Sequence, residues 1–276
     1  MIKRTLKIIL LSCLLTMFVL ALSACSTSKV TSKIKQAGTK TPYELCTEAN
    51  NTTNNMMRSS KGISETVRVT VTGPAAGESQ SISMAGDTKV NAPDTPLMEV
   101  AVNYDLQRAG QDIPMSAYYK GGMSYIQPNG QKLKKKVSMK QFHVSMGITQ
   151  FPENAIIKQK SAKTSDGTDL DFTLKGETLK GYDSLLNNLR ILNMTYGPAV
   201  QYDFKDATVT AHIGTDGSLK SCALDVPFSI AVKGKSLTGD LAMKISDITY
   251  GHQNITAPSD LSSYKDISSG TGTTAP

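Results

Sequence analysis

Apolar and polar residues alternate with a period of two along most of the chain from residue 63 onward. In Thr66–Thr72 the apolar residues Val67, Val69 and Val71 are separated by polar ones, a pattern typical of a half-buried β-strand. The parity shifts by one before Ile248, which predicts a β-bulge. The same alternation and the turn residues between the runs predict about ten strands, over 63–72, 79–89, 97–106, 114–120, 123–127, 131–137, 169–175, 208–213, 222–232 and 237–250.

Three segments have helical rather than strand signals. Thr41-Pro42-Tyr43-Glu44 combines an N-cap hydroxyl, a proline at the first helical position and a glutamate three residues after the cap, so a helix is predicted from Thr41 to about Met57. Ser138–Gly147 starts with a second capping box, and Tyr182–Leu192 carries one apolar face at helical spacing. The predicted fold class is α+β, with a single curved antiparallel sheet wrapped over two or three helices.

The first 24 residues have the composition of a secretory signal peptide. Lys3, Arg4 and Lys7 precede an apolar run that is shorter than the roughly 20 residues of a permanent membrane span. Leu22-Ser23-Ala24-Cys25 resembles the lipobox of bacterial lipoproteins. We therefore predict cleavage between Ala24 and Cys25, an S-diacylglycerol and an N-acyl group on Cys25, and attachment to the outer face of the cell membrane. Whether the N-acyl chain is present stays open, and an uncleaved membrane anchor is the alternative.

The rest of the chain divides into a tether, one domain and a tail. Residues 25–41 are polar and contain four lysines, which predicts a flexible basic tether behind the lipidated cysteine. Residues 42–267 form the predicted domain, and the Ser/Gly/Thr-rich residues 268–276 a disordered tail. Loss of the leader lowers the formal net charge from +7 to +4, because three basic residues leave with it. A mildly basic protein outside the cytoplasm is not expected to bind nucleic acid.

Few residues have the pattern of a catalytic or metal site. His143, His212 and His252 have no second ligand at metal-binding spacing, and the chain lacks nucleophile-elbow, phosphate-loop and dinucleotide motifs. Asp169 and Asp171 share one strand face, where solvation explains them more simply than acid–base catalysis does. No enzymatic activity, cofactor or metal is predicted. Cys46 and Cys222 remain as thiols, either free or bridged.

Two further compositional features suggest contacts with lipid. The densest charge cluster contains Lys132, Lys134, Lys135 and Lys136, which could contact phospholipid headgroups or an acidic polymer; a solvated rim is the alternative. The predicted domain is also rich in methionine, which suits an adaptable apolar cavity as well as ordinary core filling.

Several segments together resemble the half-barrel lipoproteins of the LolA/LppX-like superfamily, in the form found in Gram-positive bacteria. Besides the lipobox and the first helix, they are 117–125, 130–136, 168–192 and 255–267. The resemblance implies a half-barrel sheet with an apolar cavity between sheet and helices. The predicted function is a membrane-anchored extracytoplasmic lipoprotein, monomeric, that binds a lipid or other apolar ligand. The alternative is a structural or interaction lipoprotein that meets a cell-envelope protein and holds no small ligand.

Overall fold

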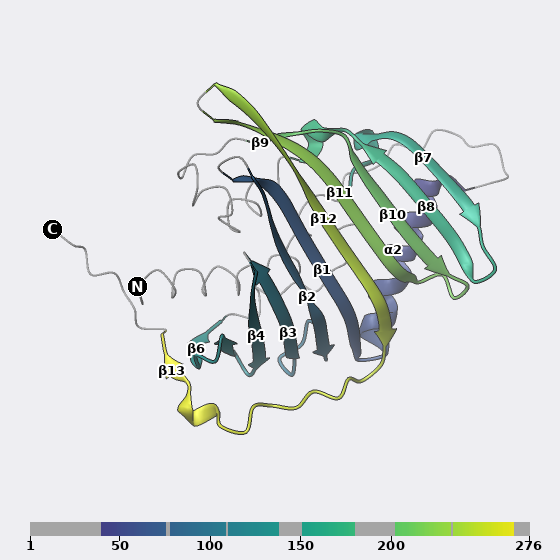
Figure 1. Ribbon diagram of the computed structural model, residues 1–276. Helices are drawn as coiled ribbons and strands as arrows, with labels where there is room; N and C mark the ends of the chain where they lie inside the picture. The colour runs from purple at the N-terminus through teal and green to yellow at the C-terminus, as the bar shows by residue number, and fades with distance from the viewer. Residues whose placement is uncertain are drawn as a thin grey trace.

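A computed structural model describes residues 40–75, 78–108, 110–137, 151–179, 202–232 and 234–267. Within this part of the chain, thirteen strands form one open sheet (Figure 1). The order is β13-β6-β5-β4-β3-β2-β1-β12-β11-β10-β8-β7, and β9 pairs with β11. Every pairing is antiparallel except that of β13 with β6. The strands are β1 (Gly62–Ala75), β2 (Glu78–Asn91), β3 (Glu99–Arg108), β4 (Gln111–Lys120), β5 (Met123–Pro128), β6 (Leu133–Lys136), β7 (Ile156–Lys163), β8 (Gly167–Leu174), β9 (Tyr202–Phe204), β10 (Ala207–Gly214), β11 (Leu219–Val232), β12 (Lys235–Tyr250) and β13 (Lys265–Asp266).

The single curved antiparallel sheet fits the prediction, but the strand count of about ten was too low. The three strands that the pattern missed are β7, β9 and β13. β7 is an edge strand whose side chains are nearly all exposed, so it has no apolar period. β9 and β13 contain three and two residues, which is too short for a period to register.

The predicted bulge is confirmed at the centre of the sheet. The register of β1 and β12 shifts between Ser64 and Thr66, which pair with Thr249 and Ser246 respectively. β12 therefore spans this interval with one extra residue, and Asp247 adopts a left-handed φ of 54° there. Beyond the bulge both strands keep one apolar face.

Helix α2 (Pro42–Ser59) confirms the first predicted helix. The Thr41 hydroxyl accepts from the Glu44 amide, and the Glu44 carboxylate accepts from the Thr41 amide, which completes the capping box. Asn50, Thr53 and Met57 are buried, so tertiary packing extends the helix through a run of poor helix formers. The Thr53 hydroxyl also accepts from the Leu219 amide at 2.9 Å, which joins α2 to the start of β11.

α2 is the sole α-helix among the described residues, whereas two or three were predicted. The other two predicted helices, 138–147 and 182–192, lie wholly outside the described residues. Short 3₁₀ turns occur at Glu153–Ala155, Gly176–Leu179 and Leu261–Ser263. No helix in the described ranges combines the length and apolarity needed to cross a membrane.

After β12 the chain forms a strap, residues 251–267, that runs past the strand ends to the far end of the sheet (Figure 1). There β13 pairs with the edge strand β6. The Tyr264 side chain is buried, packs edge-on against Tyr125 with ring centroids 5.4 Å apart, and donates a hydrogen bond to Gln127. The strap thereby covers one of the two sheet edges.

Candidate ligand-binding face

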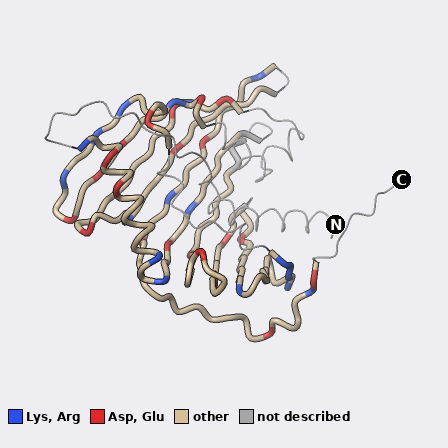
Figure 2. Tube along the Cα trace, turned by 180° about the vertical axis from the view of Figure 1, so that it is seen from behind, with Lys and Arg blue, Asp and Glu red and all other residues tan. Residues whose placement is uncertain are grey.

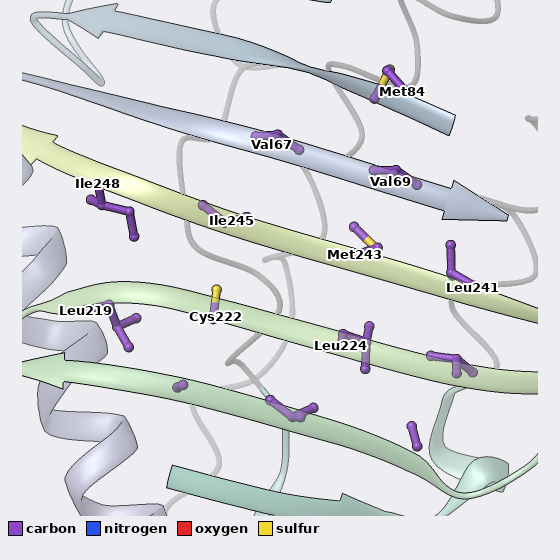
Figure 3. Packing of buried hydrophobic residues seen from close by; sticks show 14 of the residues in the cluster. Val67, Val69, Met84, Leu219, Cys222, Leu224, Leu241, Met243, Ile245 and Ile248 are labelled. Carbon is purple, nitrogen blue, oxygen red and sulfur yellow. The ribbon is translucent and has the colours of Figure 1, made fainter. Parts of the chain in front are cut away.

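One face of the sheet is mostly apolar, and we call it the inner face. On the central strands it carries Val67, Met84, Leu224 and Met243, which Figure 3 shows in one packed layer. The same alternation continues on both sides and adds Val100, Val102, Met115, Tyr119, Ile126, Leu170, Phe172, Val209 and Ile213. The inner face is the surface on which an apolar ligand would be held.

α2 lies on the inner face, but over one part of it. Its main contacts are with β1, β7, β8, β10 and β11, and Figure 1 shows it crossing behind β8 and β10. The inner faces of β2 to β5 extend beyond these contacts. Their side chains are as apolar as those under the helix, and Met84, Val102 and Met115 are all buried. This half of the inner face is the candidate ligand-binding face.

A carboxylic acid interrupts the inner face where the two halves meet. Glu65 lies on β1 with the parity of Ile63 and Val67, and only 7% of its surface is exposed. Within the described part of the chain no donor or cation contacts its carboxyl group. Burial raises the pKa of Glu65 from 4.5 to about 7, because a desolvated carboxylate loses hydration that nothing replaces. Sequence reasoning missed Glu65, although its position in an apolar period was the signal that could have found it.

Two buried hydroxyl groups lie beside Glu65 on the neighbouring strands. Thr88 on β2 is directly opposite Glu65 in the sheet register. Its hydroxyl shares a 2.7 Å hydrogen bond with the phenol of Tyr104 on β3. Gly86 makes this geometry possible, since a Cβ there would lie 2.5 Å from the Tyr104 ring. The missing side chain leaves room for the ring to lie over β2 and bring its hydroxyl to Thr88.

The two remaining cysteines are buried and unbridged. Cys46 projects from α2 and Cys222 from β11. Burial raises the pKa of Cys46 to about 12 and also raises that of Cys222. Both thiols are therefore protonated at neutral pH and behave as apolar core groups rather than nucleophiles.

The opposite face, which we call the outer face, carries His212, Asp169 and Asp171 from the sequence analysis. The His212 Nδ1 lies 2.7 Å from an Asp169 carboxylate oxygen, and Asp166 is 3.5 Å from the other ring nitrogen. Asp171 pairs with Lys160 at 3.2 Å. Lys160, Asp169, Asp171 and His212 line a groove of about 550 Å³ that is open to solvent. Among the described residues, no group of three or more His, Cys, Asp or Glu side chains could hold a metal ion.

The predicted lysine cluster is divided by the strand alternation of β6. Lys134 and Lys136 share one face, and Lys135 lies on the other. Lys132 precedes the strand and forms an ion pair with Asp260 of the strap. The strand order places β6 near one end of the sheet and the charged strands β7 and β8 at the other, and Figure 2 shows basic positions at both ends. A joint contact of all four lysines with headgroups stays a prediction.

The remaining predicted sites fall partly outside the described residues. Ala24 and Cys25, the predicted cleavage and lipidation site, lie outside them. Of the methionines, five are buried in the described core: Met57, Met84, Met98, Met115 and Met243. Met84, Met115 and Met243 lie on the inner face, where both a packed core and an adaptable binding surface would place them, whereas Met57 is on α2 and Met98 precedes β3.

No protein-family model and no curated protein matches this sequence. Solved structures do show similarity. LprF from Mycobacterium bovis is 11% identical, with 79% of this chain and 95% of that chain covered and a TM-score of 0.37. A DUF1329 family protein from Desulfovibrio piger is 9% identical, with 79% and 94% covered and a TM-score of 0.26. An outer membrane lipoprotein-sorting protein domain from Vibrio parahaemolyticus is 8% identical, with 78% and 97% covered and a TM-score of 0.24. These similarities are distant.

Proposed function

We propose that this protein is a membrane-anchored extracytoplasmic lipoprotein that binds a lipid or another apolar molecule on the inner face of its sheet. The observation that carries the proposal is the continuous apolar layer on β2 to β5, which extends beyond the main contacts of α2. Burial of hydrocarbon there would be favourable by about 25 cal/mol per Å² of apolar surface removed from water.

The anchor follows from the leader and the lipobox that ends at Cys25. A single acyl chain binds membranes weakly, so a diacylglycerol group on Cys25 is what gives stable attachment. The basic tether would then hold the domain close to the bilayer, where lipid is the most abundant apolar molecule.

Native mass spectrometry of the full chain, extracted gently from its host, tests the proposed function. We expect the protein to carry bound lipid in addition to its covalent anchor, and to take up dioleoylglycerol after the bound lipid is removed. A mass that corresponds to the anchored protein alone, together with no uptake, would contradict the proposal. That result would favour a structural or interaction lipoprotein that meets a cell-envelope partner.

A further inference from the structure

Glu65 is unusual because a buried carboxyl group faces the apolar interior without a partner among the described residues. Only 7% of the surface of Glu65 is exposed, and its carboxyl group makes no hydrogen bond or ion pair in the described part of the chain. A buried polar group that lacks a hydrogen bond costs free energy, so nearly all such groups in folded proteins are paired. An apolar residue at this position would continue the layer of Ile63 and Val67 without that cost. The carboxyl group therefore requires an explanation other than packing.

The hydroxyl pair beside Glu65 also has unused hydrogen-bonding capacity. Thr88 and Tyr104 each carry one O–H donor, and the 2.7 Å bond between them uses one of the two. No described acceptor takes the other proton. Both side chains are at most 5% exposed, so water does not explain the pair. Gly86 leaves the space that brings the Tyr104 hydroxyl to Thr88, which ties three strands into one arrangement.

We propose that Glu65, Thr88 and Tyr104 form a polar subsite that binds a hydroxyl group of the apolar ligand. A hydroxyl both donates and accepts, so it can donate to the Glu65 carboxyl and accept the unused proton of the Thr88–Tyr104 pair. The inference rests on the proposed function, and it adds the class of ligand: an apolar molecule with a free hydroxyl, as in a diacylglycerol.

The charges around the subsite favour a neutral group over an ionic one. A ligand carboxylate would meet the Glu65 carboxyl with no described cation to offset it. A ligand ammonium would need an ionised Glu65, and both desolvated charges would then depend on a single ion pair. The raised pKa of Glu65 keeps much of the carboxyl protonated near neutral pH, which suits a hydroxyl partner.

The test compares two lipids that differ only in whether the glycerol hydroxyl is free or methylated. The full chain, stripped of bound lipid, is titrated with 1,2-dioleoylglycerol and with its 3-O-methyl ether, and binding is read by native mass spectrometry. We expect about tenfold tighter binding of dioleoylglycerol, the effect of one or two net hydrogen bonds. Equal affinity for the two lipids would overturn the subsite and leave the proposed function standing. Absence of binding to either lipid, in a protein that also carries no bound lipid when extracted from its host, would overturn both.

Variants locate the preference at the proposed residues. Glu65→Leu should abolish the preference for the hydroxyl, whereas Glu65→Gln, which keeps a donor and an acceptor, should retain most of it. Tyr104→Phe removes a single hydroxyl and should lower the preference for dioleoylglycerol severalfold. This variant tests the subsite even if Glu65→Leu does not fold. Tyr118→Phe is the matched control, because the Tyr118 hydroxyl is bonded to Glu99 on the outer face. A preference that Tyr118→Phe reduces as much as Tyr104→Phe does would contradict the assignment.

Discussion

At the scale of single residues, Glu65 shows how much of the candidate site could be predicted from the sequence. Its neighbours Ile63 and Val67 are apolar with the same parity, and the period-two pattern correctly predicted their burial. A glutamate in such a run breaks the pattern, and its parity with Ile63 and Val67 is the signal from which its burial could have been predicted. The cluster with Thr88 and Tyr104 depends on register between three strands, which the sequence does not fix.

Glu65 should make stability fall as pH rises through the mildly acidic range. Its pKa is about 7 in the folded protein and 4.5 in the unfolded chain, so between these values the folded state holds a proton that the unfolded state has released. The stability present below pH 4.5 is then lost as pH approaches 7, by on the order of 3 kcal/mol. The titratable neighbours Tyr104 and Cys222 have raised pKa values and do not ionise in this range.

Urea denaturation of the wild-type protein and Glu65→Gln between pH 4.5 and 7.5 measures this effect. The free energy of unfolding of the wild-type protein, taken relative to Glu65→Gln, should decline across the range. Because both proteins share every other titrating group, their difference isolates Glu65. A constant difference would mean that Glu65 is ionised or solvated in the folded protein.

At the scale of elements, the strands with the clearest alternation of apolar and polar residues were the ones predicted correctly. β1, β11 and β12 are long strands with one apolar face, and their alternation predicted them together with the bulge near Ile248. The capping box at Thr41 predicted the start of α2. β7 and β13 were missed because their positions depend on pairing with β8 and β6, and not on burial of their own side chains.

The strap should depend on one aromatic side chain. Tyr264 is 4% exposed and is the strap residue whose ring packs on Tyr125, so Tyr264→Ala should weaken the local closure of residues 251–267 by about 3 kcal/mol. Hydrogen exchange of the strap amides measures this closure. Tyr264→Phe keeps the ring contact and loses only the bond to Gln127, so it should cost about 1 kcal/mol. Unchanged protection of the strap in Tyr264→Ala would show that β13 and the Lys132–Asp260 ion pair suffice to hold it.

At the scale of the whole molecule, the proposed anchor determines where the protein lies, and the sheet provides the candidate ligand-binding face. The anchor is predicted from a short motif around Cys25, which needs no tertiary structure to be recognised. The inner face is assembled from residues far apart in the chain, such as Val67 and Met115, which are 48 positions apart, so it emerges only from the fold. Location could thus be predicted from sequence more directly than the chemistry of the ligand.

Cys25→Ala should therefore move the protein off the membrane without unfolding it. We expect the variant in the soluble fraction, without incorporation of labelled palmitate and with an unchanged circular dichroism spectrum. Cys46→Ala is the matched control, because it removes a buried cysteine from α2 and should leave the protein in the membrane fraction. Retention of Cys25→Ala in the membrane would count against lipidation at this residue.

Photolabelling tests the central claim, that the inner face binds lipid, most directly. A diacylglycerol with a diazirine in one acyl chain is bound to the full chain, irradiated, and the labelled residues are mapped by peptide mass spectrometry. The account predicts labels on inner-face residues of β2 to β4, such as Met84, Val102 and Met115, and their loss on competition with unlabelled dioleoylglycerol. Labelling confined to the outer face, or labelling that competition does not reduce, would contradict it.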